Sequence, residues 1–192
     1  MQRRSFLQNI VAAAAALAAA PVGAVTATGH MTTGRYLRPP GSLPEEDFIG
    51  RCIRCGQCGE ACPNRCIKFF SMDGGLLSYN TPYITPREQG CILCMKCGEA
   101  CPTGAIREIV RDARTIIDKV KMGRAVVDKD LCLSYQGKTC GVCYRACPLQ
   151  DVAIKVGMLE QPRVLEACVG CGLCERSCIQ IPQAIRIIPN YV

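Results

Sequence analysis

Residues 52–63 read CIRCGQCGEACP and place four thiols within eleven positions, directly before a proline. A disulfide bridge stabilises a protein by closing a loop, and closing a two-residue loop gains little while it strains the bond. The stretch therefore argues against a disulfide framework. It indicates instead a centre that needs several soft ligands close together.

The chain contains four copies of this motif, whose spacing is C-x2-C-x2-C-x3-C. The first motif covers residues 52–63 and the second residues 91–102, and both end in proline. The third, residues 132–148, is stretched, with seven residues between its first two cysteines in place of two, and the fourth covers residues 168–178. The motifs contain sixteen of the seventeen cysteines: Cys52, Cys55, Cys58, Cys62, Cys91, Cys94, Cys97, Cys101, Cys132, Cys140, Cys143, Cys147, Cys168, Cys171, Cys174 and Cys178.

This spacing is typical of bacterial ferredoxins, in which three thiolates of one motif bind a [4Fe–4S] cluster and the fourth binds the cluster of a partner motif. We therefore predict four [4Fe–4S] clusters whose iron is bound by these sixteen cysteines, and no catalytic residue. Because every ligand position is a cysteine, no [3Fe–4S] cluster is expected. Structural zinc would use C-x2-C pairs separated by longer spacers and would leave two thiols of each motif unused.

The remaining cysteine is Cys66, in the sequence CPNRC. We interpret it as a small, partly buried hydrophobic residue rather than as an alternative ligand. The chain has no tryptophan and only 5% aromatic residues, so a conventional core of large side chains cannot be its main source of stability. Cluster binding and folding are therefore expected to be coupled.

The formal net charge of +7 counts every thiol as neutral. A cluster with its four thiolates carries about −2, so four clusters would remove the apparent basicity. The sequence has no basic run interleaved with aromatic residues and no nucleic-acid-binding motif. We therefore expect no nucleic-acid partner.

The N-terminal residues predict an export signal. Arg3 and Arg4 form a twin-arginine pattern before a weakly apolar, alanine-rich stretch at 10–25, and residues 25–27 form a small-residue cleavage site. The apolar stretch is short for a membrane anchor, so a cleaved signal over residues 1–27 is favoured and an uncleaved tether stays open. The twin-arginine route exports folded, cofactor-loaded proteins, which suits clusters assembled in the reducing cytoplasm.

Short β-branched or apolar runs flank the motifs, at residues 67–70, 105–109, 125–127, 152–156, 163–165 and 184–188. They predict an α+β fold of duplicated ferredoxin-like lobes, with small β-hairpins and short helices around the four clusters. Apolar residues within 106–120 recur at helical spacing, which predicts an amphipathic helix overlapping or following the run at 105–109. Ser42, Pro44 and Glu45 resemble the N-cap, first-turn proline and capping-box glutamate of another helix.

The predicted organisation is a signal peptide, a linker and one cluster-binding region. The linker covers residues 28–44, which are rich in glycine, threonine and proline, and the four-cluster ferredoxin-type region covers residues 45–192. The single histidine, His30, lies in the linker, so no histidine-based site is expected.

Several segments together resemble the NapG/MauM family of exported ferredoxin-type proteins: the twin-arginine pattern, LRPPG at 37–41, TPY at 81–83, the first and fourth motifs, and above all the stretched CLSYQGKTCGVCYRACP at 132–148. The resemblance covers nearly the whole chain. It implies a periplasmic relay of electrons from a membrane quinol-dehydrogenase-type protein towards a periplasmic cytochrome or reductase. Among these acceptors, a reductase of the nitrate-reductase type is favoured. It also allows peripheral association with the membrane.

Other functions stay open. The chain could be a maturation or assembly factor for a periplasmic redox enzyme, or a fixed electron-transfer subunit of an oxidoreductase complex. The gap between Cys94 and Cys97 is narrower than in family members of the nitrate-reductase type, so the branch of the family is open as well. The sequence contains no Gly-rich phosphate loop or catalytic triad, and we expect no catalysis by the chain alone.

The pairing of the motifs is also open. Adjacent pairing joins the first motif to the second and the third to the fourth, whereas nested pairing joins the first to the fourth and the second to the third. Both schemes satisfy the crossed-ligand rule. A resemblance to four-cluster subunits of molybdenum oxidoreductases favours nesting, in which Cys178 completes the cluster of the first motif, Cys62 that of the fourth, Cys147 that of the second and Cys101 that of the third.

Overall fold

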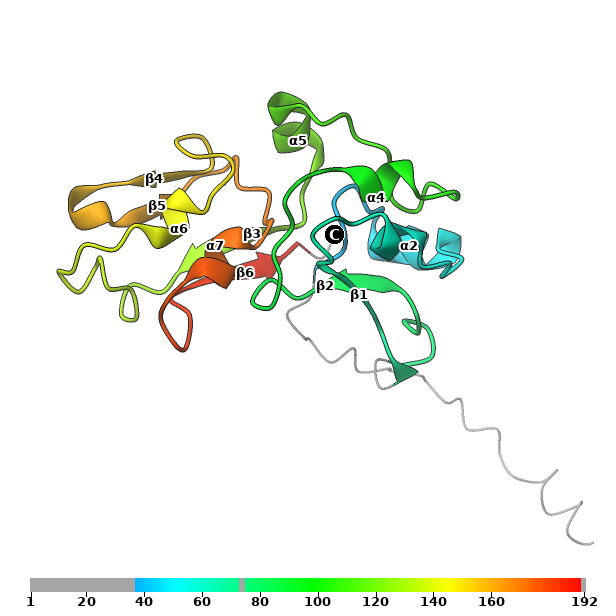
Figure 1. Ribbon diagram of the computed structural model, residues 1–192, viewed down its shortest axis with the longest axis horizontal. Coiled ribbons are helices and arrows are strands. Elements are labelled where there is room, and N and C mark those ends of the chain that lie inside the picture. The colour runs from blue at the N-terminus through cyan, green and yellow to red at the C-terminus, as the bar shows by residue number, and fades with distance from the viewer. Residues whose placement is uncertain (1–36, 73–74, 191–192) are drawn as a thin grey trace, which may run out of the picture. The chain divides into compact units, whose positions relative to one another are not determined.

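The computed structural model describes residues 37–72 and 75–190 (Figure 1). The predicted export signal, His30 and most of the predicted linker lie outside the described residues. The α-helices in these ranges are all short: α2 (Glu45–Arg51), α3 (Gln57–Glu60), α4 (Lys96–Glu99), α5 (Ala113–Lys119), α6 (Val142–Arg145) and α7 (Leu173–Ser177). A 3₁₀ helix, η2, covers Met158–Glu160. Within the described part of the chain, no helix has the length and apolar character that a membrane span requires.

The strands in the described ranges form three small antiparallel sheets. They are β1 (Ile67–Phe69), β2 (Pro82–Ile84), β3 (Gly123–Val127), β4 (Ile154–Val156), β5 (Pro162–Val164) and β6 (Ile185–Pro189). β1 pairs with β2, β4 with β5, and β3 with β6 (Figure 1). β4 and β5 form a local hairpin, whereas β3 and β6 lie on either side of the third and fourth motifs in the sequence. The fold therefore combines short helices with small antiparallel strands, as the sequence predicts.

Five of the six predicted runs contain a strand, and the run at 105–109 does not. There, Ile106 makes a single antiparallel bridge to Ser42, and its side chain is buried. The run is apolar because it packs inward, not because it belongs to a sheet. β2 was not predicted, because a three-residue strand that begins with proline carries little sequence signal.

The amphipathic helix predicted within 106–120 is shorter than its apolar spacing suggests. α5 begins at Ala113, because Asp112 has extended backbone and its carboxylate accepts hydrogen bonds from the N–H groups of Arg114 and Thr115, both at 3.1 Å. A helix that follows the run at 105–109 is therefore confirmed, and an overlap with that run is wrong.

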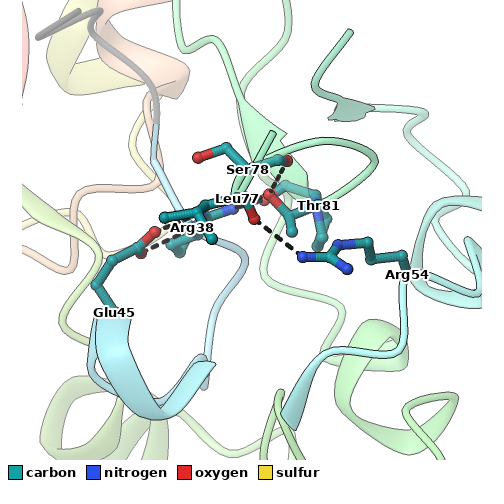
Figure 2. Close-up of polar contacts among 7 residues, drawn as sticks. Arg38, Glu45, Arg54, Leu77, Ser78 and Thr81 are labelled. Atoms are coloured by element: carbon teal, nitrogen blue, oxygen red, sulfur yellow. Dashed lines mark hydrogen bonds and ion pairs between the residues drawn. The ribbon is translucent and has the colours of Figure 1, made fainter. Parts of the chain in front are cut away.

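The short helix predicted before Cys52 is present as α2, but it begins at Glu45, later than the predicted N-cap at Ser42 implies, and the predicted capping box is wrong. Pro44 occupies the N-cap position without a side-chain cap, and the buried Ser42 hydroxyl has no hydrogen-bond partner among the described residues. The Glu45 carboxylate instead pairs with both Nε and Nη2 of Arg38, the Nε contact being 2.8 Å (Figure 2). Arg38 Nη1 also donates to Thr81 Oγ1 at 3.0 Å. The planar guanidinium of Arg38 thus binds the Glu45 carboxylate in place of the backbone N–H group that a capping box would use.

Residues 37–44, which belong to the predicted linker, are part of the folded body. Leu37 is 1% exposed and exchanges backbone hydrogen bonds of 2.8 and 2.7 Å with Ile84 in β2. The Arg38 guanidinium lies 4.6 Å from the ring centroid of Phe48, which is fully buried in α2. The predicted linker therefore does not extend as far as residue 44.

Candidate iron–sulfur sites

All four cysteine motifs make the same turn after their second cysteine. The next residue has left-handed backbone, with φ of 79° at Gly56, 62° at Met95, 57° at Gly141 and 84° at Gly172. A short helix then begins, and α3, α4, α6 and α7 carry the third cysteine of the first, second, third and fourth motif. The stretched third motif keeps this turn and helix, so its wider first gap, seven residues in place of two, changes only the approach to them.

The structure brings the sixteen predicted ligands together in four groups of four, each lining one pocket. We name these groups site 1 (Cys52, Cys55, Cys58 and Cys101), site 2 (Cys91, Cys94, Cys97 and Cys62), site 3 (Cys132, Cys140, Cys143 and Cys178) and site 4 (Cys168, Cys171, Cys174 and Cys147). In each site three thiols come from one motif and the fourth from its partner.

The partner motifs are neighbours in the sequence, so the nested pairing that we favoured is wrong. Cys101 completes the pocket of the first motif and Cys178 that of the third. The chain between the first two motifs folds back through β1 and β2, and Asn64 Nδ2 then donates to the carbonyl of Gly90 at 2.7 Å. This return places the two motifs side by side. We call them the first motif pair, and the third and fourth motifs the second motif pair.

The donor set and its spacing fit an iron–sulfur cluster. Each site offers four sulfur ligands, which suit soft metals such as zinc and iron–sulfur centres. In residues 37–72 and 75–190, no three His, Cys, Asp or Glu side chains converge closely enough to hold a single metal ion. The thiols instead stand around the wall of a pocket. That arrangement matches a cube of iron and sulfide better than it matches one tetrahedral zinc ion.

Burial governs the proton affinity of the thiols. It raises the pKa of Cys58 and Cys143 to about 11 and that of Cys97 and Cys171 to about 12. Repulsion from neighbouring thiolates adds to the effect of burial, as Cys52 does for Cys58. Thiols with such pKa values are neutral at physiological pH without metal, so iron must displace their protons when it binds.

Hydrogen bonds from backbone N–H groups act against burial and lower the pKa of the thiols that accept them. The N–H of Leu93 donates to Cys91 Sγ and that of Ile106 donates to Cys101 Sγ, both at 3.4 Å. Such bonds stabilise the negative charge on sulfur, and around a bound cluster they help to set its reduction potential. Close backbone approach depends on glycine at Gly98, where a Cβ atom would lie 2.4 Å from the carbonyl oxygen of Arg107.

Sites 2 and 4 adjoin each other, where the two motif pairs meet. The backbone N–H of Cys91, a ligand of site 2, donates to the carbonyl of Cys171, a ligand of site 4, at 2.7 Å. The chain is tightly packed here, since a Cβ atom on Gly90 would lie 2.8 Å from the Leu173 nitrogen. Site 1 differs, because Cys55 is exposed while the other sixteen cysteines are buried or half-buried.

The seventeenth cysteine lies at site 2. Cys66 is 2% exposed, lines the same pocket as the four thiols of that site, and its Sγ is 3.5 Å from Cys62 Sγ. The sequence predicts its burial, although not how complete it is. Its place beside a ligand was missed, and the available signal was its position four residues after Cys62 and three after Pro63.

Thiol pockets on turns of this form, held among short helices and small antiparallel sheets, define a ferredoxin-type iron–sulfur protein, a class that transfers electrons. Residues 51–105 match the 4Fe-4S dicluster domain family, and residues 165–178 match the 4Fe-4S binding domain family. The chain is 38% identical to the ferredoxin-type protein NapG of Escherichia coli, over 97% of this chain and 85% of the relative. The chain belongs to the NapG/MauM family of ferredoxin-type proteins.

The two names in that family are equally close to this chain. The methylamine utilization ferredoxin-type protein MauM of Methylorubrum extorquens is 38% identical over 98% of this chain and 89% of the relative. MauM of Methylophilus methylotrophus is 42% identical over 80% of this chain and 71% of the relative. The dicluster match at 51–105 contains both motifs of the first pair, in agreement with adjacent pairing. The stretched third motif lies outside both matched ranges.

Proposed function

We propose that this chain holds four [4Fe–4S] clusters, one in each site, and relays electrons along them in the order site 1, site 2, site 4, site 3, or in reverse. The observation that supports this order is the hydrogen bond from Cys91 to Cys171, which places sites 2 and 4 next to each other. Within each motif pair, the crossed ligands place the two sites next to each other: Cys62 of the first motif belongs to site 2, and Cys101 of the second motif belongs to site 1. Consecutive sites are thus linked through the backbone.

The residues of each site have three tasks. The thiolates bind iron, the backbone N–H groups of residues such as Leu93 and Ile106 bond the sulfurs, and buried side chains such as Met95 exclude water. A bound [4Fe–4S] cluster would supply one-electron redox chemistry without proton transfer to a substrate. Because the surrounding backbone is fixed by tight turns, the sites need little rearrangement when the charge changes.

The two outer sites are where partners would dock. Beside site 1, Ile53 is 63% exposed, and the Arg54 guanidinium anchors an apolar loop by donating to the carbonyl of Leu77 at 3.0 Å (Figure 2). Beside site 3, Ile179 is 60% exposed. Apolar surface around an outer redox centre suits a transient electron-transfer partner. One partner would be a membrane quinol-dehydrogenase-type protein and the other a periplasmic cytochrome or reductase.

Family membership and the twin-arginine pattern support the periplasm as the location of this relay, with peripheral association with the membrane. A reductase of the nitrate-reductase type is the acceptor that we propose first. A role in the maturation or assembly of a periplasmic redox enzyme is the second candidate, because MauM relatives are as similar to this chain as NapG is. Deleting the protein separates the two: loss of a relay leaves the partner enzyme fully matured, whereas loss of an assembly factor leaves it without its cofactor.

Iron and sulfide analysis of the anaerobically purified protein tests the cluster count directly. Four clusters give about sixteen irons per chain, and EPR of the reduced protein should show interacting [4Fe–4S] centres. A value near eight irons would contradict the proposal, since two sites would then be empty. Co-purification from membranes would identify the partners, and a constant ratio to an enzyme would instead support a fixed subunit.

A further inference from the structure

Site 2 contains five thiols, whereas the other three sites contain four. All seventeen cysteines lie within the described residues, and the pockets of sites 1, 3 and 4 contain no cysteine besides their four predicted ligands. In site 2 the additional thiol is that of Cys66, with its Sγ 3.5 Å from Cys62 Sγ. Cys91, the first ligand of the second motif, lines the same pocket. Cys66 therefore contacts one ligand of site 2 and shares the pocket with the other three.

A tight turn places Cys66 there. The chain leaves Cys62, passes Pro63 and turns at Arg65, whose φ is 46° and whose N–H donates to the carbonyl of Cys62 at 3.1 Å. Cys66 follows at once, directly before β1. Its sulfur is thus held over the sulfur of Cys62 by backbone geometry, not by a flexible loop.

Packing alone does not require sulfur at this position. The residue four positions after the fourth cysteine of the second motif is Ala105, which is 1% exposed and fills the matching place beside site 1. In the third and fourth motifs the matching residues are Asp151 and Pro182. A small apolar side chain therefore meets the packing need, and a thiol adds the capacity to bind iron.

We propose that Cys66 is an alternative ligand of site 2, able to replace Cys62 as the thiolate that the first motif supplies. In the exchange the iron–sulfur bond to Cys62 breaks, a bond to Cys66 forms, and the proton of the Cys66 thiol passes to Cys62 sulfur across their 3.5 Å contact. Charge and electron count are unchanged. The proposal rests on the proposed function only in that site 2 must hold a cluster.

The exchange matters because of where site 2 lies. Cys91 of this site bonds Cys171 of site 4, so site 2 is an inner member of the proposed order. Loss of its cluster would interrupt the electron route between the two motif pairs. A second thiol would retain the cluster, and with it the route, when Cys62 is damaged or displaced. Site 1, the site with an exposed cysteine, has no such reserve.

Four variants test the proposal: Cys62→Ala, Cys66→Ala, the double variant, and Cys101→Ala as the matched control. Cys101 is the crossed ligand of site 1 as Cys62 is of site 2, but its neighbour at the matching position is Ala105. Each protein is purified without air, its iron and sulfide are counted, and the EPR spectrum of the reduced form is recorded. Circular dichroism follows the fold.

Cys62→Ala should keep about sixteen irons per chain, as should Cys66→Ala, while the double variant and Cys101→Ala should each keep about twelve or fewer. The spectrum of one cluster should change in Cys62→Ala, because its fourth thiolate is a different residue. A Cys62→Ala protein that loses iron to the same extent as the double variant, or fails to accumulate while Cys66→Ala is fully loaded, would overturn the proposal. An unmutated protein near eight irons would instead refute the four-cluster proposal.

Discussion

The two motif pairs build the same thiol geometry with different residues. At the left-handed position after the second cysteine, the second motif has Met95, 2% exposed, whereas the fourth has Gly172. The difference is crowding, because a Cβ atom on Gly172 would lie 2.7 Å from Cβ of Pro86. At Gly56 in the first motif, no atom lies within 4 Å of such a Cβ. Met95 shows that positive φ alone does not dictate glycine in these turns, and crowding against Pro86 is an additional reason for glycine at Gly172.

The largest expected contrast between the pairs comes from removing one ligand in each. Cys55→Ala, at the exposed site 1, should cost about four irons and leave the other sites loaded. Cys171→Ala should cost more than four, because the Cys171 backbone also holds Cys91 of site 2 and folding is coupled to metal binding. Iron analysis with circular dichroism measures both. Equal iron losses in the two variants would show that the backbone contact between Cys91 and Cys171 does not couple sites 2 and 4.

A smaller contrast is expected from adding one methyl group at matched turn positions. Gly172→Ala should lower the free energy of unfolding by about 3 kcal/mol, from left-handed strain plus overpacking against Pro86. Gly56→Ala, with a similar φ and open space, should lower it by about 1 kcal/mol. The measurement is the denaturant concentration at which cluster absorbance is lost under anaerobic conditions. If Gly56→Ala proved as harmful as Gly172→Ala, crowding could not be the reason for the difference between the pairs.

The smallest effect concerns a polar contact that the first pair lacks. Glu175 in α7 is 2% exposed, and its Oε2 accepts a hydrogen bond of 2.6 Å from the N–H of Ile187 in β6. The first pair has Gly59 and Gly98 at the matching position. Glu175→Ala should lower the free energy of unfolding by about 2 kcal/mol, because the buried N–H loses its partner.

Glu175→Gln is the matched control for this contact. Its amide oxygen can accept the same bond, so the loss should be below about 1 kcal/mol. Hydrogen exchange at the Ile187 amide reports on the contact directly and should accelerate in the alanine variant alone. Equal protection of this amide in both variants would show that the carboxylate does not stabilise β6.

Spacing made the ligands predictable, because the distance between cysteines along the chain is itself the signal of a cluster loop. The short strands were predictable for a similar reason, since β-branched runs are local. Pairing was not, because Cys101 and Cys178 satisfy the crossed-ligand rule equally well for either partner. What decides it is the return of the chain that brings Asn64 to Gly90, and that contact joins residues far apart in the sequence.

The errors at the helices and at Cys66 have the same origin. Ser42 and Glu45 have the right types and spacing for a cap, but Arg38 competes for the carboxylate once the chain is folded. The apolar residues around Ile106 fit a helix equally well until the bridge to Ser42 fixes them as extended chain. Cys66 lies outside the four motifs, and its position shortly after Cys62 became informative only when the fold placed the two sulfurs 3.5 Å apart.

Adjacent pairing has a consequence for the order in which the protein is made. Every ligand of sites 1 and 2 lies between Cys52 and Cys101, so both sites are complete before the ribosome has synthesised the second motif pair. Under nested pairing, the first site would have waited for Cys178. If the sites hold clusters as we propose, sites 1 and 2 can be loaded before the second motif pair is made, and the loaded half can then serve as a template onto which the second half folds.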